Sequence, residues 1–370
     1  MKNGEILVLG AYGLAGRTVI DGLVKLTDKT VVAAGRDSQK LETVLSDVPK
    51  DRCRKLELDA GDPNALQKAI ENINLVINTV GPYPIFGEQI AKAAIRNHTA
   101  YIDCANEQIH FRKLQQLDQS AKRNGIPIVT AAGAIPGLST LLADKLLRQF
   151  PAAESVNITF AQFRHAYEGS GLGSIMSGVL DAVNLPSALI DGEHKPVVLG
   201  RSFRKFDLPA PFGKRNMLEV PTIDTLILSE KFRLQNLHTW FYLGEQPAWM
   251  FGLIRLLKPH KRQWAYELIK KVAHHTDSAE FEKAIKAGHG PEAMLHVEIS
   301  NATDSKSGTV LLKDGAIPMA YLPVIIAKNY LTGRTAHTGL GTPLDFLDFD
   351  TFADVAQDAI IETNFHGVDG

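Results

Sequence analysis

The chain has 370 residues, of which 45% are hydrophobic, so it is long enough to bury two hydrophobic cores. Its 40 lysine and arginine residues nearly balance its 41 aspartate and glutamate residues, which argues against the basic surface that nucleic-acid-binding proteins carry. Only two cysteines occur, Cys53 and Cys104, and neither belongs to a metal-binding cluster, so the sequence predicts no structural metal site and no disulfide framework.

Short apolar runs alternate with helical patterns over the first third of the chain. The predicted strands are 5–10, 30–35, 54–59, 74–80, 99–104 and 126–131, and the predicted helices are 14–26, 37–46, 63–71, 86–97 and 107–123. The strands are apolar on both faces, which is typical of a parallel sheet covered by helices on each side. This pattern predicts an α/β fold with a doubly wound Rossmann domain over residues 1–135.

The rhythm changes after Pro136, where a mixed order of strands and helices predicts a second, α+β domain over residues 136–335 that binds the substrate or a second copy of the chain. The predicted helices are 137–150, 172–185, 247–257, 261–273, 278–286 and 318–331, and the predicted strands are 155–163, 196–206, 238–243, 292–299 and 307–313. A separate C-terminal segment, 336–370, contains a turn and an apolar-periodic helix.

Three glycines, Gly10, Gly13 and Gly16, lie where the first predicted strand meets the first predicted helix. Glycine permits a tight turn and leaves backbone amides open to an anion, and helix N-termini attract phosphate. The GxxGxxG spacing differs from the commoner GxGxxG, but its place at the first strand–helix turn predicts a dinucleotide site. The expected contact residues are Gly10, Tyr12, Gly13, Leu14, Ala15 and Gly16. The alternative is that the glycines serve only a tight turn.

The end of the second predicted strand indicates which dinucleotide binds. NAD sites usually hold an acidic residue there, whereas NADP sites offer arginine to the 2′-phosphate. Here Gly35 leaves room and Arg36 supplies a guanidinium, so we expect NADP rather than NAD. Asp37 is the contrary signal, although it is also a good N-cap for the next helix. The alternative for Arg36 is a solvated side chain at a helix start.

Two further strand ends are expected to border the cofactor. Asp59 and Ala60 follow the third strand and would lie near the adenine, whereas Asp62, before a proline, is interpreted as an N-cap. The fourth strand ends in a bend that would pass the cofactor, and Tyr83 would face the nicotinamide or cover the sheet edge. The expected residues of this bend are Val80, Gly81, Pro82 and Tyr83.

Four segments together resemble the saccharopine dehydrogenase-like family of oxidoreductases. They are "VLGAYGLAGR", "AAGRDSQKL", "NTVGPYPIFGEQIAKAAIRNHTAYIDCANE" and "AAGAIPGLSTLLADKLL", and "GSGLGSIMSGV" and "GLGTPLDFLD" extend the likeness. The resemblance implies a Rossmann domain with an α/β substrate domain, NADP as the usual cofactor, and a C-terminal segment that packs back on the Rossmann domain. The chain departs from the lysine-pathway enzymes throughout 200–335, so we do not expect saccharopine as the substrate.

Candidate proton carriers follow the fifth predicted strand and open the second domain. Asp103 could transfer a proton if burial raises its pKa, Cys104 would border the cofactor, and Glu107 could transfer a proton or stabilise a helix start. In the second domain, Arg164 and His165 follow a strand, so that His165 could serve as acid or base. The alternative for His165 is an ordinary surface or packing residue.

Residues 249–271 combine bulky apolar side chains with lysine and arginine, which is compatible with contact to a membrane surface or an acyl ligand, or with packing on the protein itself. We expect an NAD(P)-dependent oxidoreductase acting on a C=N, C=O or C=C bond of a small molecule. The alternative is a non-catalytic NADP-binding sensor or scaffold protein. Because the sequence shows no signal-peptide pattern and no long apolar span, we expect a cytoplasmic protein. We also expect it to form a homodimer.

Overall fold

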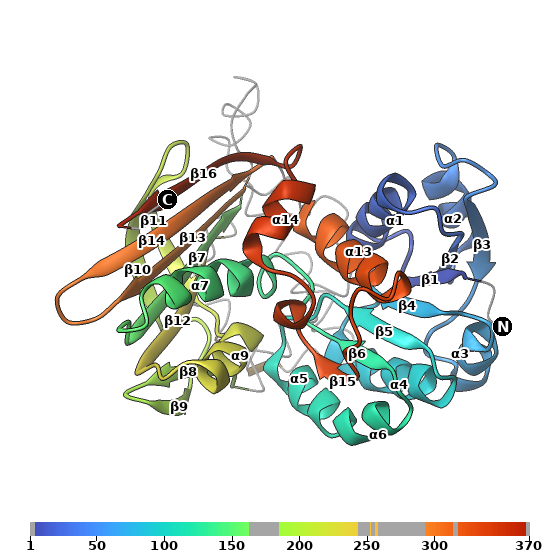
Figure 1. Cartoon of the computed structure of the whole chain (residues 1–370), viewed down its shortest axis with the longest axis horizontal. Coiled ribbons are helices and arrows are strands. Elements are labelled where there is room, and N and C mark those ends of the chain that lie inside the picture. Colours follow the sequence, from blue (N-terminus) through green and yellow to red (C-terminus); the bar gives the residue numbers. More distant parts are fainter. Residues whose placement is uncertain are drawn as a thin grey trace. The chain divides into compact units, whose positions relative to one another are not determined.

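The computed structural model describes residues 4–162, 185–242, 252, 256–257, 293–313 and 317–367. Its contacts divide the chain into two compact units (Figure 1). The first consists of Met1–Leu141, Gly169–Gly173 and Ala316–Ala356, and the second of Leu142–Glu168, Ser174–Gly315 and Gln357–Gly370. The predicted α/β class is confirmed, with a parallel sheet in the first unit and a mixed sheet in the second.

The first unit is built on a seven-stranded parallel sheet in the order β15-β6-β5-β4-β1-β2-β3. The strands are β1 (Ile6–Leu9), β2 (Val31–Gly35), β3 (Cys53–Glu57), β4 (Leu75–Asn78), β5 (Ala100–Asp103), β6 (Pro127–Val129) and β15 (Gly339–Gly341). From β1 the strands β2 and β3 continue to one side of the sheet, and β4, β5 and β6 continue to the other, so the strand order reverses between β1 and β4. In open α/β sheets, ligands bind in the crevice at this topological switch point.

Helices follow the strands in alternation, as predicted. They are α1 (Leu14–Leu26), α2 (Ser38–Leu45), α3 (Pro63–Ile70), α4 (Tyr83–Arg96), α5 (Gln108–Gln115) and α6 (Asp118–Arg123). Aspartates begin two of them, because Asp37 accepts the amides of Gln39 and Lys40, and Asp62 accepts those of Asn64 and Ala65. Both N-caps that the sequence suggested are therefore confirmed.

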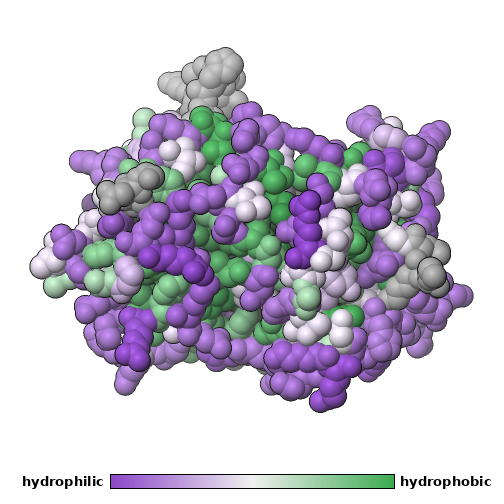
Figure 2. All heavy atoms as spheres, viewed as in Figure 1, coloured by the Kyte–Doolittle hydropathy of each residue, from purple (hydrophilic) through white to green (hydrophobic). Residues whose placement is uncertain are grey.

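The predicted helix 107–123 is in fact two helices. The amide of Leu117 turns back to the carbonyl of Leu114, 2.8 Å away, and ends α5 before α6 begins. On α6, Lys122 pairs with Asp118 at 2.7 Å, and the region of this helix, at the lower edge of Figure 2, is hydrophilic. Helix α4 starts three residues earlier than expected because Pro84 is accommodated in its first turn.

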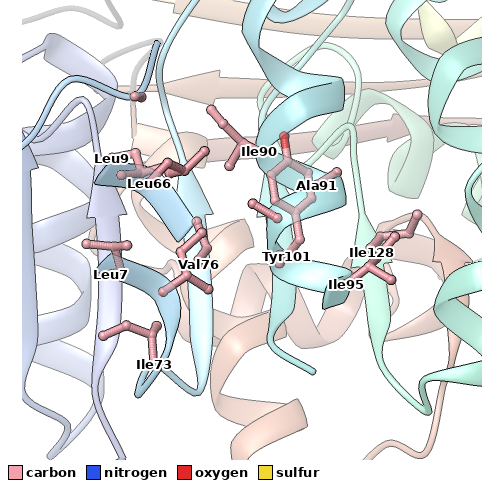
Figure 3. Close-up of a cluster of buried hydrophobic side chains, with 14 of the residues drawn as sticks. Leu7, Leu9, Leu66, Ile73, Val76, Ile90, Ala91, Ile95, Tyr101 and Ile128 are labelled. Carbon is pink, nitrogen blue, oxygen red and sulfur yellow. The ribbon is translucent and has the colours of Figure 1, made fainter. Parts of the chain in front are cut away.

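A core of aliphatic side chains fills the space beside the sheet of the first unit. Figure 3 shows Leu7, Val76 and Ile90 in this cluster, with the Tyr101 ring beside Ala91 of α4. These side chains are fully buried, so that burying each contributes about 1.5–3 kcal/mol to folding. The ends of the strands that contribute these side chains are consequently fixed in place.

Chain segments far along the sequence complete the first unit. Helix α13 (Ile317–Leu331), which the sequence analysis grouped with the second domain, packs on α1, and Lys25 donates to the hydroxyl of Tyr321 at 2.9 Å. Strand β15 lies beside β6, with the Leu340 amide 2.9 Å from Asp118 Oδ1. The short helices η3 (Pro343–Asp345) and α14 (Phe349–Val355) follow.

The second unit is built on a mixed sheet in the order β10-β11-β12-β7-β13-β14-β16, with β8 and β9 attached at β12. Among the described residues of this unit, the helices are α7 (Leu138–Gln149), within which the boundary between the units falls, and α9 (Ile223–Lys231). The strands are β7 (Ser155–Gln162), β8 (Ser187–Ile190), β9 (Glu193–Pro196), β10 (Phe203–Leu208), β11 (Gly213–Glu219), β12 (Asn236–Tyr242), β13 (Ala293–Ser300), β14 (Ser305–Leu312) and β16 (Ile360–His366).

Several elements of the second unit were not predicted. Helix α9 buries Asp224 and Thr225 together with apolar residues, which hides the amphipathic pattern of a helix. The predicted strand 196–206 is the end of β9 and the start of β10 with a turn between them. Four predicted helices fall wholly or almost wholly outside the described residues. They are 172–185, 261–273, 278–286 and 247–257, and of the last only residues 252, 256 and 257 are described. Within the described part of the chain, no helix is long and apolar enough to span a bilayer.

Candidate functional site

The turn between β1 and α1 lies at the switch point of the first sheet. Gly10 has φ +80°, a conformation that residues with a side chain rarely adopt. A Cβ at Gly10 would also lie 2.8 Å from the hydroxyl oxygen of Thr79, which donates to the Leu9 carbonyl at 2.7 Å. Glycine is therefore required where the ends of β1 and β4 approach each other.

Gly16 lies against the same turn from the first turn of α1. A Cβ there would overlap the Gly10 carbonyl oxygen and lie 2.8 Å from the Ala11 Cα. This close approach is the role of the third glycine in dinucleotide-binding turns. No side chain caps the N-terminus of α1, whose N-cap is Gly13, and its first turn contains no acidic residue. The amides at this helix end can therefore meet a phosphate, so the cradle fits a dinucleotide pyrophosphate.

The end of β2 carries the second predicted part of the site. Gly35 is buried, and Arg36, directly after it, is exposed. Asp37 is turned to the start of α2, where two amides lie 3.1 Å from its Oδ1. Those amide hydrogen bonds and the Lys40 side chain lower the pKa of Asp37. Its carboxylate is thus occupied as a cap, and Arg36 remains available to an incoming phosphate.

Asp59 and Ala60 follow β3 as expected from the sequence. Asp59 is exposed, and its Oδ1 accepts the amide of Gly61 at 2.8 Å. Ala60 is buried, and its carbonyl accepts the Gln89 amide group at 3.0 Å. These bonds fix the backbone at the rim where an adenine is expected, without filling it with a large side chain.

The bend after β4 is held by Asn78, which the sequence analysis did not identify. Its Oδ1 accepts the amide of Val80 at 2.9 Å, and its Nδ2 donates to the Tyr101 hydroxyl at 3.1 Å. Gly81 and Pro82 then lead into α4, where the Tyr83 hydroxyl lies 3.4 Å from the Asn78 carbonyl. Burial, followed by the nearby Cys104 and Asp103, raises the pKa of Tyr83, so this phenol stays neutral at physiological pH.

Asp103, at the end of β5, is the centre of a buried network. Its Oδ2 accepts from the Tyr101 hydroxyl at 2.7 Å and lies 2.7 Å from Nε2 of His110. Its Oδ1 accepts from the Thr130 hydroxyl at 2.5 Å and from the Ala105 amide at 3.0 Å. Through Tyr101 the network continues to Asn78, so that it ties together the ends of β4, β5 and β6.

The condition under which Asp103 was expected to transfer a proton is not met. Burial alone would raise its pKa, but the charge of His110 and hydrogen bonds from His110, Thr130 and Tyr101 outweigh that effect and lower it. The side chain is also wholly inaccessible to solvent. A carboxylate with a lowered pKa and four donors is suited to holding its neighbours, so Asp103 is better described as a positioning residue.

Cys104 and Glu107 lie close to the same strand end. Burial raises the pKa of Cys104 far above its usual value, so the thiol is uncharged. Glu107 is buried at the N-cap of α5, and its Oε2 accepts the Asn106 amide at 3.1 Å. Its side chain makes no cap hydrogen bond to the amides that open α5, whose first turn contains no acidic residue, so both roles of Glu107 stay predictions.

The structure brings the predicted residues of the first unit to one edge of its sheet, at the carboxyl ends of β1 to β5. The predicted acid or base His165 lies outside the described residues, as does nearly all of 249–271. Sequence reasoning missed Asn78, Tyr101, His110 and Thr130. Asn78 and Thr130 are polar residues close to the ends of the predicted strands 74–80 and 126–131, which is a usable signal, whereas the pairing of His110 with Asp103 needs the fold.

Comparisons with known proteins agree with this geometry. Residues 6–129 match the family model described as saccharopine dehydrogenase NADP binding domain. A Caenorhabditis elegans "lipid droplet localized protein" is 31% identical over 36% of this chain and 34% of its own. A "putative trans-acting enoyl reductase" of Mycobacterium tuberculosis is 27% identical over 50% of this chain and 46% of its own. The resemblance inferred from the four sequence segments is confirmed.

A solved structure supports the fold described above. Apo saccharopine dehydrogenase (L-Glu forming) from Saccharomyces cerevisiae covers 99% of this chain and 100% of its own with a TM-score of 0.67 and 16% identity. At that identity the likeness is one of fold. The chain spans about a third of the length of the first of these curated relatives and about half of the second.

Proposed function

From the premise that residues 6–129 carry a saccharopine dehydrogenase NADP binding domain, we propose that the chain is an NADP-dependent oxidoreductase. It would reduce or oxidise a C=N, C=O or C=C bond of a small molecule. The observation that carries the proposal is the open N-terminus of α1, packed on Gly10 through Gly16 at the switch point of the sheet.

Each part of the dinucleotide has a partner in this proposal. The amides of Leu14, Ala15 and Gly16 bind the pyrophosphate, and Arg36 binds the 2′-phosphate. Asp59 and Ala60 border the adenine. The bend at Val80, Gly81 and Pro82, with Tyr83 and Cys104, borders the nicotinamide, which when bound supplies hydride transfer.

The remaining task of the chain is to hold the reacting groups and to carry a proton. The Asp103 network fixes the ends of β4, β5 and β6, so it orients Tyr83 and the bend beside the nicotinamide. Because Asp103 is buried and ionised, we assign the proton step to a group outside this network, and His165 is the candidate from the sequence. The relative named as an enoyl reductase supports C=C among the three bond types.

Titration of the purified protein with NADPH and NADH, followed by calorimetry, tests the cofactor. NADPH should bind more tightly, and Arg36→Ala should weaken NADPH much more than NADH. The matched control is Arg123→Ala, on the exposed end of α6, which should change neither affinity. Equal affinities for the two cofactors in the wild-type protein would remove the NADP assignment.

Turnover separates the enzyme from the sensor or scaffold that also fits an NADP site. Purified protein and NADPH are incubated with enoyl thioesters, ketones and imines while NADPH absorbance is followed. Oxidation that His165→Ala abolishes without weakening NADPH binding supports the oxidoreductase. Binding without turnover on any of the three bond types would favour the sensor. A cytoplasmic location, a homodimer, the lack of nucleic-acid binding and membrane contact through 249–271 stay predictions.

A further inference from the structure

The ring of Tyr12 lies directly over Gly35. Tyr12 belongs to the turn between β1 and α1, and Gly35 is the last residue of the neighbouring strand β2. A Cβ built on Gly35 would overlap Cε1 of the Tyr12 ring and lie 2.8 Å from Cδ1. With φ outside the left-handed region, Gly35 needs no special backbone freedom. A side chain at this position would therefore require the Tyr12 ring to move.

Two cationic side chains flank this ring contact. The Lys40 ammonium lies 5.7 Å from the centroid of the Tyr12 ring and 3.4 Å from Oδ2 of Asp37. Arg36 is exposed immediately after Gly35. Asp37, the N-cap of α2, pairs with Lys40 through this Oδ2, and its other oxygen accepts two amides at the start of that helix. The end of β2 therefore presents two cations and an aromatic face.

In dinucleotide-binding sites, the residue at the position of Gly35 contacts the 2′ group of the adenine ribose. An acidic side chain at the end of this strand accepts the ribose 2′-hydroxyl of NAD, whereas a cation accepts the 2′-phosphate of NADP. With Tyr12 in its present position, any side chain at residue 35 would have to displace the ring. The same ring holds Lys40 by a cation–π contact on the side where a phosphate would bind.

We infer that Tyr12 is a specificity-determining residue, which selects a 2′-phosphorylated adenine nucleotide by excluding a side chain at residue 35 and by holding Lys40. This inference rests on the proposed dinucleotide function of the same turn. It adds that the choice between the two cofactors depends on an aromatic residue of the phosphate-binding turn as well as on Arg36 of the neighbouring strand.

The probes are adenosine 2′,5′-bisphosphate and AMP, which differ only in the 2′-phosphate. Calorimetry at one fixed ionic strength gives the ratio of their dissociation constants. Tyr12→Phe keeps the ring and should keep the ratio. Tyr12→Leu, which keeps apolar bulk without an aromatic face, should reduce the preference for the bisphosphate by about two- to fivefold, the size of an exposed cation–π contact. Lys40→Met should reduce the preference at least as much.

A double substitution tests the steric part. Gly35→Asp alone should lower the melting temperature, because the new side chain meets the Tyr12 ring. Adding Tyr12→Ala should restore the melting temperature and turn the preference toward AMP. The inference is overturned if Tyr12→Leu leaves the ratio unchanged, or if Gly35→Asp has the same effect with and without Tyr12. If the wild-type protein binds neither probe, the proposed function fails first, so the two failures are distinguishable.

Discussion

His110 of α5 and Asp103 of β5 form a hydrogen-bonded pair in which Nε2 of the imidazole lies 2.7 Å from Oδ2 of the carboxylate, and both side chains have 0% exposure. The Asp103 carboxylate has further donors in Tyr101 and Thr130. A buried carboxylate is tolerated only when such partners compensate for its lost hydration. The stability of the strand ends beside the proposed nicotinamide site therefore depends on this one charge.

Asp103→Asn removes that charge and leaves the four donors with a weaker acceptor. We expect the free energy of unfolding to fall by about 3–5 kcal/mol, as when one partner of a buried charged pair is removed. Urea denaturation followed by circular dichroism measures it. Glu71→Gln, at an exposed position after α3, is the control and should change stability by about 0.5 kcal/mol or less. A loss under about 1 kcal/mol for Asp103→Asn would contradict the positioning role.

The stabilising effect of Asp103 should depend on pH in acid. Because the pKa of Asp103 is lowered in the folded protein, the folded state holds its proton less strongly than the unfolded chain, whose value is about 3.9. The contribution is complete above that value and is lost as the pH falls toward the folded pKa. The difference in stability between wild type and Asp103→Asn should thus shrink below about pH 4. A stability difference between wild type and Asp103→Asn that grows as the pH falls would contradict this prediction.

Gly16→Ala should damage the phosphate-binding turn more than Gly13→Ala. At Gly16 a Cβ overlaps the Gly10 carbonyl oxygen, whereas at Gly13 the nearest atom is 3.3 Å away. We expect Gly16→Ala to cost about 1–3 kcal/mol of stability, the usual range for overpacking, and to weaken NADPH binding. Thermal melting with and without NADPH measures both effects. Equal melting temperatures for the two variants would show that close packing at Gly16 is dispensable.

The two thiols should react slowly in the folded protein. Burial raises the pKa of Cys53 to about 11 and raises that of Cys104 still further. Because the thiolate is the reactive form, modification by Ellman's reagent near pH 8 should be slow and should accelerate strongly in denaturant. A rapid reaction of either thiol under native conditions, resolved by mass spectrometry, would contradict the raised pKa values of these thiols.

Sequence periodicity was sufficient for β1 to β6 of the first unit because each of these strands is followed by a helix. β1, α1 and β2 lie within a residue or so of the predicted ranges, and Gly16 has the packing role expected from its spacing. The caps at Asp37 and Asp62 could be predicted because an N-cap depends on residues within one turn. Such local features can be predicted from the sequence without knowledge of the fold.

Long-range pairings could not be predicted in this way. Asp103 was proposed for proton transfer from its place at a strand end, but His110 and Thr130, which lower its pKa, are brought to it by α5 and β6. Likewise, nothing in the spacing of Tyr12 and Gly35 indicates that the ring of one requires glycine at the other. In the second unit, β7 lies between β12 and β13, which are far from it in the sequence, and β16 pairs with β14.

The central claim is that a dinucleotide lies across the turn between β1 and α1, and a crystal structure of the protein with NADP tests it most directly. We predict pyrophosphate oxygens about 3 Å from the amides at the start of α1 and the 2′-phosphate beside Arg36 and Lys40. A dinucleotide bound away from Gly10, Gly13 and Gly16 would contradict the account.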